Sequence, residues 1–495
     1  MALSTVLSRA TCGIDAPLVR VETHLSNGLP CFTLVGLPET AVRESRERVR
    51  SAIINSHLSF PDQRITINLS PADLPKEGGR FDLPIALGIL AASEQLPMEA
   101  LLGGEFLGEL GLDGELRPVS GVITAAQAVA DTGRTLHLPN GNAPLAALIP
   151  EVAIIGAGNL LQLCAHLNGR EPLSTAHALP LHADDNYPDL RHIVGQSAPR
   201  RALEIAAAGG HNLLMSGAPG SGKTLLARCL AGLLPPPSLP ELLPTLAMQN
   251  LSSSTVQPQL KRPFRSPHHS ASGPALVGGG SHPRPGEISL AHGGVLFLDE
   301  LPEFPRQVLD MLRQPLEEGH VTLVRAKHRT TYPARFQLVA AMNPCLCGYY
   351  GDPDRDCRCS PEQIQRYLSR VSGPLLDRFD LYVHVQRIAF TELSIATPEV
   401  EPSSTVRVRV TASQTTQQQR QGCLNTQLPH QQLTNICQLS RADTNYLETS
   451  AEKLKLSLRG FHRTLRVART IADLESSEVV EREHVAQALA FREQH

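Results

Sequence analysis

Residues 217–224, with the sequence GAPGSGKT, match the phosphate-binding pattern G-x-x-x-x-G-K-[ST]. Glycines let a backbone curl around a phosphate chain, so that amide N–H groups face the phosphate oxygens. Within this loop, Lys223 would reach the β- and γ-phosphates, and the Thr224 hydroxyl would hold Mg²⁺. The residues expected to contact the nucleotide are Gly217, Ala218, Pro219, Gly220, Ser221, Gly222, Lys223 and Thr224. The sequence therefore predicts a site for ATP and Mg²⁺.

The segments on both sides give this loop the context that the pattern requires. The apolar run LLM at residues 213–215 is typical of a buried strand, and residues 225–234 have the pattern of a helix. The N-terminus of that helix would add its dipole to the attraction of the phosphates. An ordinary glycine turn before a helix is the alternative, and the complete match with both flanks disfavours it.

An acidic pair ends a second apolar run, GGVLFLDE. Residues 295–298 suit a central parallel strand, which would deliver Asp299 and Glu300 to its carboxyl end. Asp299 would orient Mg²⁺ or its bound water, and Glu300 would polarise the attacking water as a general base. A third run, residues 336–341, ends just before Asn343, whose amide can hydrogen-bond the γ-phosphate or that water. Together these side chains predict Mg²⁺-dependent ATP hydrolysis.

Four of the ten cysteines lie close together in the sequence CLCGYYGDPDRDCRC. Cys345 and Cys347 form one C-x-C pair, and Cys357 and Cys359 form another. Four thiolates on a loop that folds back can converge on a structural zinc ion. Cysteines of zinc ribbons are usually spaced two residues apart, so reduced thiols and a redox disulfide remain alternatives.

Two further segments carry basic residues whose roles the sequence leaves open. Arg378, in LLDRFDL, has the pattern of an arginine finger, which reaches the γ-phosphate of the ATP bound by a neighbouring subunit. The alternative is a salt bridge within the chain to Asp377 or Asp380. Residues 319–336 alternate like a hairpin. This alternation places three cations on one side of the hairpin: Arg325, Lys327 and Arg329. They could form a solvated face, or they could be directed into the channel of a ring to contact phosphates.

The elements around these residues divide the chain into parts. Residues 1–168 mix strand-like runs, such as Cys31 to Val35, with helical stretches and lack a P-loop, which predicts an α+β domain. Residues 169–188 are polar and rich in proline and are expected to be a linker. Residues 189–390 would form the P-loop core, with the cysteine insertion at 345–359. In residues 391–495, a polar stretch rich in threonine and glutamine is expected to link the core to a helical lid.

Composition excludes several classes of protein. A chain of 495 residues can bury the cores of two or three domains. A net charge of -3 excludes a polybasic coat for nucleic acid, so any DNA contact must come from local patches or from a surface built by several subunits. No apolar run approaches the roughly 18 residues of a membrane span, and the first residues lack the apolar stretch of a signal peptide. We expect a cytoplasmic protein with no membrane partner.

The motifs GAPGSGKT, GGVLFLDE, LLDRFDL and FHRTLRVA, with Asn343, together resemble AAA+ ATPases of the magnesium-chelatase-like branch. Residues 71–90 and 114–126 resemble the segments that carry the serine and the lysine of the Lon-protease-like (ribosomal S5 domain 2-like) fold. Arg80 and Ile123 stand at those two positions, and neither side chain can perform acyl transfer. The N-terminal domain is therefore expected to be a structural or interaction module.

With the two C-x-C pairs and the sequence FRSPHHSAS, the chain resembles the ComM/YifB family over essentially its whole length. In FRSPHHSAS, His268 and His269 are interpreted as polar loop residues in preference to metal ligands. The resemblance assigns Asn343 as sensor 1 and the lid residue Arg463 as sensor 2, which would contact the nucleotide bound by its own subunit. Arg466 and Arg459 are rival candidates for sensor 2.

The resemblance also implies a function. Members of the family are expected to form homo-hexameric rings on single-stranded and branched DNA and to act as ATP-driven helicases. The implied process is branch migration in homologous recombination, during integration of DNA in natural transformation (competence). A magnesium-chelatase-type motor that remodels a protein partner is the alternative. An ATP-dependent protease is a third possibility, which Arg80 and Ile123 disfavour.

Overall fold

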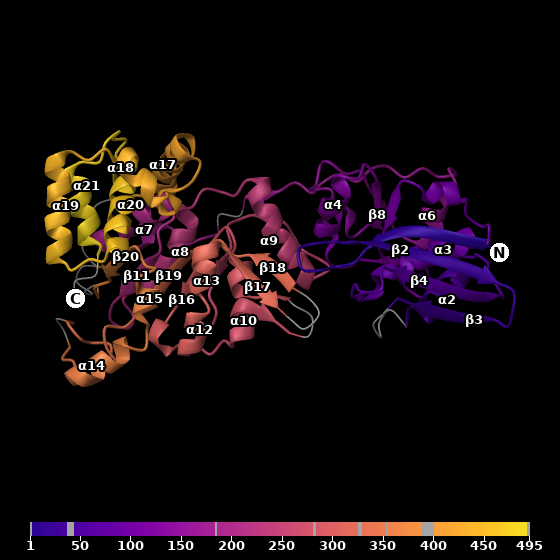
Figure 1. Cartoon of the computed structure of the whole chain (residues 1–495), viewed down its shortest axis with the longest axis horizontal. Helices are drawn as coiled ribbons and strands as arrows, with labels where there is room; N and C mark the ends of the chain where they lie inside the picture. Colours follow the sequence, from indigo (N-terminus) through magenta and orange to yellow (C-terminus); the bar gives the residue numbers. More distant parts are fainter. Residues whose placement is uncertain are drawn as a thin grey trace.

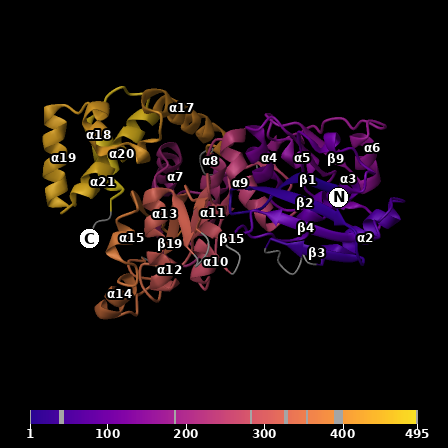
Figure 2. The ribbon, with the colours of Figure 1, turned by 45° about the vertical axis from the view of Figure 1, so that its right-hand side comes forward.

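The computed structural model describes residues 2–36, 44–183, 186–280, 284–324, 329–352, 355–387 and 400–492. The molecule is elongated, with a sheet domain from the first part of the chain at one end, the P-loop domain in the middle, and helices from the last part at the other end (Figures 1 and 2). Within the described ranges, no helix combines the length and the apolar character that a membrane crossing needs. Of the predicted basic hairpin, Arg325 and Lys327 lie outside the described residues.

The N-terminal domain is built on a mixed seven-stranded sheet in the order β3-β4-β2-β1-β5-β8-β9. Its strands are β1 (Ala2–Arg9), β2 (Leu18–Ser26), β3 (Cys31–Val35), β4 (Arg64–Ser70), β5 (Gly104–Phe106), β8 (Thr135–Pro139) and β9 (Ile154–Ala157). Its helices include α2 (Ser45–Asn55), α3 (Asp82–Ala92), α4 (Val122–Ala130), α5 (Ala143–Ala146) and α6 (Leu160–Leu167). Every residue of α3 is buried, because this apolar helix packs on β1 and β2 and supplies the centre of the core.

The two positions that resemble a protease dyad carry structural side chains. Arg80 is buried, and its guanidinium donates hydrogen bonds to the carbonyl oxygens of Arg9 and Ser120. Burial lowers the pKa of Arg80 to about 10. Ile123 is fully buried in α4. Since neither side chain is a nucleophile or a general base, these positions provide no acyl-transfer chemistry.

The P-loop domain contains a five-stranded, all-parallel sheet in the order β13-β16-β19-β11-β20. Its strands are β11 (Leu213–Ser216), β13 (Phe264–Arg265), β16 (Val295–Leu298), β19 (Gln337–Met342) and β20 (Leu381–His384). Its helices are α7 (Ser197–Gly209), α8 (Lys223–Leu233), α9 (Leu239–Ser252), α10 (Gly273–Val277), α11 (Glu287–Leu290), α12 (Arg306–Asp310), α13 (Arg313–Glu318), α14 (Pro361–Leu368) and α15 (Gly373–Leu376). Strands β17 (His320–Val324) and β18 (Arg329–Pro333) form a separate antiparallel hairpin.

Helices cover both faces of the parallel sheet, because side chains alternate between the faces along each strand. Leu213 and Met215 pack in one core cluster with α7 and α8. Leu214, between them in sequence, packs in the opposite cluster with residues from Leu301 to Leu312. With both faces buried, all five strands can be apolar, and their carboxyl ends meet at one edge of the sheet.

The last part of the chain forms a helical group of α17 (Ser403–Gln421), α18 (His430–Cys437), α19 (Arg441–Lys453), α20 (Leu458–Leu474) and α21 (Arg482–Ala490). The prediction of a polar linker between the core and the lid is wrong for residues 403–421, which form helix α17. Val406 and Val410, one turn apart, are buried against the P-loop domain. Gln414 and Gln417 continue the same face, and their amides donate to the carbonyl oxygens of Ala207 and Ala208 at 2.8 and 3.0 Å. Polar composition concealed this helix because part of its buried face consists of glutamines.

The N-terminal domain and the P-loop domain share a hydrophobic core cluster. Leu242 and Leu246 of α9 are buried with residues of α4. The Asn250 side chain accepts a hydrogen bond from the backbone N–H of Val122 at 2.7 Å, at the start of α4. Between the two domains, in the predicted linker, β10 (His182–Ala183) pairs with β12 (Gln259–Leu260) of the P-loop domain. The two domains are thus packed together as well as connected in sequence.

Candidate nucleotide-binding site

The glycine-rich loop lies between the end of β11 and the start of α8. The Lys223 ammonium donates to the carbonyl oxygens of Gly217 at 2.7 Å and Ala218 at 2.9 Å. Burial lowers the pKa of Lys223, and the nearby Asp299 and Glu300 oppose that effect. A Cβ atom at Gly217 would lie 2.2 Å from the carbonyl oxygen of Val385, so only glycine allows this close backbone approach. The loop is therefore shaped as a cradle with a buried cation.

The predicted magnesium ligands are in contact with each other. The Thr224 hydroxyl donates to the Asp299 carboxylate at 2.8 Å, which joins the start of α8 to the carboxyl end of β16. Both groups are oxygen donors, the type that Mg²⁺ prefers. The Asn343 carboxamide oxygen lies 3.3 Å from the Lys223 ammonium. The parallel sheet thus brings Lys223, Thr224, Asp299 and Asn343 to one edge, and these residues fit a nucleotide with its metal ion.

Glu300, the predicted general base, is held by a contact that the sequence did not indicate. Its side chain is 54% exposed, and its carboxylate lies 3.0 Å from Nδ1 of His269. The backbone of Glu300 has a φ of 54°, a left-handed conformation that is uncommon outside glycine and concentrates at functional sites. The His269 ring also packs on His268 and edge-on against Phe304, with ring centroids 4.1 and 6.5 Å apart.

The sequence alone indicates only a polar loop residue at His269. It reaches Glu300 because β13 pairs with β16 in parallel, so that the loop after β13 lies beside the residues that follow β16. No motif spacing links the two residues. The only available signal was the unusual length of the irregular segment that contains His269, which is typical of functional loops.

Arg378 and Arg463 lie at the opposite end of the sheet from Lys223. Arg378 precedes β20, which runs parallel to β11, so its position is at the amino end of the strand, whereas the P-loop follows the carboxyl end. Arg463 of α20 is buried, lies 3.7 Å from the Asp380 carboxylate and donates to the carbonyl oxygen of Phe379 at 3.4 Å. Within one chain, this geometry does not bring Arg463 to the nucleotide of its own subunit, the contact that the sensor 2 prediction requires.

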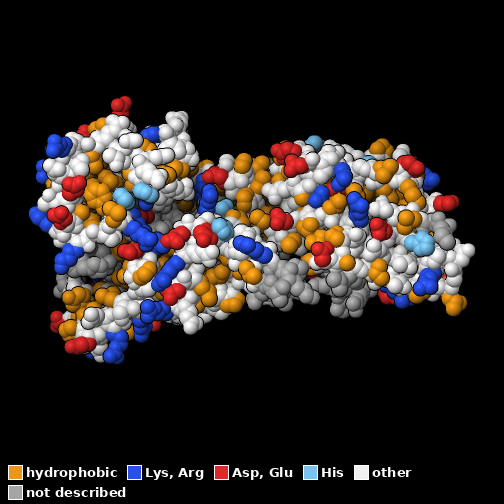
Figure 3. All heavy atoms as spheres, viewed as in Figure 1, with side chains coloured by type: hydrophobic (Ala, Val, Ile, Leu, Met, Phe, Trp, Pro, Cys, Tyr) orange, Lys and Arg blue, Asp and Glu red, His pale blue; other side chains and the backbone are white. Residues whose placement is uncertain are grey.

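Arg378 belongs to a group of cations, here named the arginine cluster: Arg313, Arg378, Arg459 and Arg463. Burial, and then the charges of the other three members, lower the pKa of Arg378. The Arg378 guanidinium also pairs with the Glu317 carboxylate. On the face shown in Figure 3, Lys and Arg side chains gather over the P-loop domain where it meets the lid, with acidic side chains among them.

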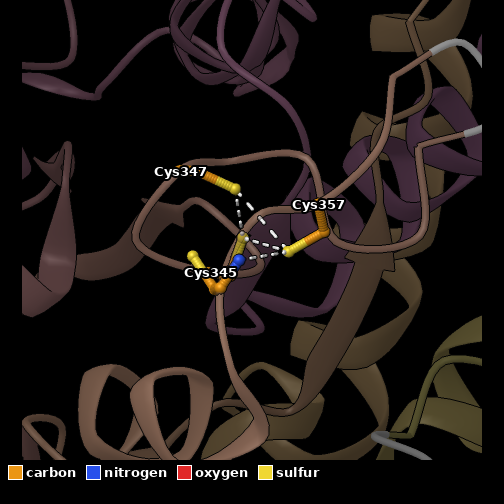
Figure 4. A group of neighbouring side chains, drawn as sticks. Cys345, Cys347 and Cys357 are labelled. Atoms are coloured by element: carbon orange, nitrogen blue, oxygen red, sulfur yellow. Dashed lines mark hydrogen bonds between the residues drawn. The ribbon is translucent and has the colours of Figure 1, made fainter.

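The four clustered cysteines converge in space, and Figure 4 labels three of them, Cys345, Cys347 and Cys357. All four Sγ atoms lie within 4.8 Å of one another. Sγ of Cys345 lies 3.4 Å from that of Cys347 and 3.6 Å from that of Cys357, and the latter two are 3.6 Å apart. Sulfurs at about 2.3 Å from zinc form a tetrahedron with edges of about 3.8 Å, so this arrangement fits a zinc site. All four cysteines are free of disulfides.

The parallel sheet order, the P-loop after β11, the acidic pair after β16 and the packed helical lid define an AAA+ P-loop ATPase core. Three family models match successive parts of the chain: subunit ChlI of Mg-chelatase over residues 21–142, magnesium chelatase subunit ChlI over 189–393, and its C-terminal region over 400–492.

Full-length relatives specify the family further. The chain is 50% identical over 503 residues to the competence protein ComM of Haemophilus influenzae, covering 99% of this chain and 98% of that protein. It is 49% identical over 494 residues to YifB of Salmonella typhimurium, covering 99% and 97%. The DNA replication licensing factor Mcm6 of Drosophila melanogaster is 23% identical over 214 residues, covering 41% of this chain and 25% of that protein. The chain belongs to the ComM/YifB family of magnesium-chelatase-like proteins, as its motifs predict.

Proposed function

We propose that this protein is a cytoplasmic ATP-driven motor that forms a homo-hexameric ring on single-stranded and branched DNA and promotes branch migration. The integration of incoming DNA during natural transformation is the process that the similarity to the competence protein ComM supports. The weaker similarity to Mcm6, a DNA replication licensing factor, also favours a role on DNA.

The position of the arginine cluster is the observation that carries this proposal. Arg378 and Arg463 lie at the end of the sheet opposite to their own P-loop. A neighbouring subunit that placed its P-loop against the cluster would bring phosphate oxygens to these arginines, in competition with their carboxylate partners Asp310, Glu317 and Asp380. Each ATP would then lie between two subunits, which makes a ring the active form.

Each residue of the proposed nucleotide site would have a distinct role in ATP hydrolysis. Lys223 would exchange its two carbonyl partners for the β- and γ-phosphates, and Thr224 and Asp299 would hold Mg²⁺, which neutralises phosphate charge when bound. Glu300 would accept a proton from the attacking water, and Asn343 would orient that water or the γ-phosphate. Arg378 of the next subunit would stabilise the charge that develops on the phosphate oxygens.

The test is ATP hydrolysis and strand separation on three-strand and four-way DNA junctions. We expect hydrolysis to rise several-fold with junction DNA, DNA binding to weaken steeply with salt because it depends on phosphate contacts, and Lys223→Ala to separate no strands. Hydrolysis that is indifferent to DNA, or equal strand separation by the wild type and Lys223→Ala, would contradict the proposal.

The matches to magnesium-chelatase models over all three parts of the chain favour a second candidate, a motor that remodels a protein partner for metal insertion into a tetrapyrrole. The same hydrolysis assay separates the two functions. Stimulation by a chelatase partner with porphyrin, in the absence of DNA, would support the second candidate.

His269 should affect how Glu300 is positioned. We expect His269→Ala to lower kcat about tenfold with little change in KM for ATP, because Glu300 would lose the partner 3.0 Å from its carboxylate. His320→Ala is the control, since His320 is an exposed histidine of the same domain that pairs with Glu318 and not with Glu300. Steady-state phosphate release measures both variants, and equal losses in both would contradict a specific role for the contact between His269 and Glu300.

A further inference from the structure

The cysteine cluster lies directly beside the nucleotide site. Cys345 is buried and follows Asn343 by two residues, at the point where the chain leaves β19. The loop that carries the four thiols occupies residues 344–360, and α14 starts at its other end. Within its described part, Leu346 is 59% exposed and Tyr350 is 56% exposed. These two large side chains therefore add little to the packing of the loop on the protein core.

One side of this loop packs on the P-loop through Gly348. Gly348 has a φ of 84°, and a Cβ atom there would lie 2.6 Å from Cδ of Pro219 and 2.8 Å from its Cγ. The same Cβ atom would be 3.8 Å from Cγ of Asn343. The backbone N–H of Gly348 donates to the carbonyl oxygen of Cys345 at 3.0 Å. A backbone turn that contains Cys345 and Cys347 thus carries the glycine that touches the phosphate-binding loop.

The far end of the loop returns to Asn343 through α14. This helix begins at Pro361, two residues after Cys359, and Ser360 and Gln363 form its capping box. Tyr367 of α14 is buried close to the backbone N–H of Asn343, which partly opposes the rise in the pKa of Tyr367 that burial causes. Cys359 directly precedes the capping residue of α14, and α14 in turn places the buried Tyr367 beside the backbone of Asn343.

We propose that one zinc ion bound by Cys345, Cys347, Cys357 and Cys359 braces the ATP site. Zinc would close the loop, press Gly348 against Pro219 and hold α14 in place behind Asn343. Binding converts thiols to zinc thiolates with release of their protons, and no redox change takes place. A disulfide joins only two sulfurs, at about 2.05 Å, whereas three near-equal separations between 3.4 and 3.6 Å suit one central ion.

Because the brace acts on the proposed ATP site, its test measures zinc content and nucleotide affinity separately. Full-length protein purified without added metal would be analysed by elemental mass spectrometry, and affinity would be measured with a fluorescent ATP analogue. We expect one zinc per wild-type chain. Cys357→Ser should lose the zinc and bind the analogue about tenfold or more weakly, whereas Cys423→Ser, outside the cluster, should change neither.

Two glycine variants test the contact with Pro219 without removing a thiol. Gly348→Ala should keep zinc but bind the analogue more weakly, because its Cβ atom would displace Pro219. Gly351→Ala is the matched control: Gly351 lies in the same loop at a φ of 76°, and a Cβ atom there would meet nothing within 4 Å. The control should therefore bind the analogue like the wild type.

The outcomes separate the brace from the ATP site itself. A wild-type protein without zinc, or a Cys357→Ser variant with unchanged affinity, would overturn the brace alone. If Gly348→Ala and Gly351→Ala lost the same amount of affinity for the ATP analogue, the proposed role of the contact between Gly348 and Pro219 would be wrong. A zinc-loaded wild type that fails to bind the ATP analogue would instead overturn the proposed function and the brace with it.

Discussion

Glu300→Gln should lower kcat for ATP hydrolysis by about 10³ and leave ATP binding nearly unchanged. Glutamine keeps the size of the side chain but cannot accept a proton from water. Lys223, Thr224 and Asp299, which would hold the nucleotide and its metal ion, stay in place. The measurements are steady-state phosphate release and equilibrium binding of a fluorescent ATP analogue.

An exposed carboxylate elsewhere in the same domain provides the control. Glu318 lies at the end of α13 and interacts with Gln314 and His320. Glu318→Gln should hydrolyse ATP at the wild-type rate. If Glu300→Gln also turned over normally, another group would have to activate the water. If it failed to bind the analogue, Glu300 would be needed for nucleotide binding as well as for catalysis.

Arg378→Ala should lower kcat by about 10³ in DNA-stimulated hydrolysis, because an arginine finger stabilises transition-state charge by that order or more. The alternative role, an ion pair with the half-exposed Glu317 carboxylate, predicts a much smaller effect on kcat, since such a pair would contribute to stability without contacting the nucleotide. Glu317→Ala separates these roles, because it removes the pair but leaves the arginine. Arg306 is an exposed arginine of α12 outside the arginine cluster. Arg306→Ala therefore controls for the effect of removing one positive charge from the surface.

Mixing two inactive variants tests whether Arg378 acts on a neighbouring subunit. Lys223→Ala chains keep Arg378, and Arg378→Ala chains keep the P-loop. In a mixed ring, some interfaces combine an intact P-loop with an intact Arg378 from the next chain, so hydrolysis should partly return. Mixed samples that stay as inactive as the separate variants, after co-assembly is verified, would exclude this sharing of the site.

Several parts of the fold and site followed from short segments of sequence. The match of GAPGSGKT and its flanks predicted a strand, a phosphate loop and a helix, and the structure has β11 and α8 at those places. The strand predicted from Cys31 to Val35 is β3. The apolar run before Asp299 is β16, buried on both faces. Such features are readable because hydrophobic period and glycine geometry act within a few residues of one another.

Other features depended on contacts between segments far apart in sequence. The polar composition of residues 390–425 predicts a linker, yet α17 (Ser403–Gln421) forms within this stretch because glutamine amides find carbonyl partners on α7. The predicted own-subunit role of Arg463 rested on its place in the lid, whereas the direction of β20 and the packing of α20 decide where it lies. Neither outcome is encoded in local periodicity.

The amino-acid sequence by itself determined the chemical groups: a phosphate loop with Lys223, an acidic pair, four thiols, and a resemblance that the relatives confirm. Tertiary structure alone decided that His269 meets Glu300, that Gly348 packs on Pro219, and that Arg378 lies away from its own P-loop. The physical reason is that residue type and spacing specify what a group can do, whereas strand order and packing specify which groups meet.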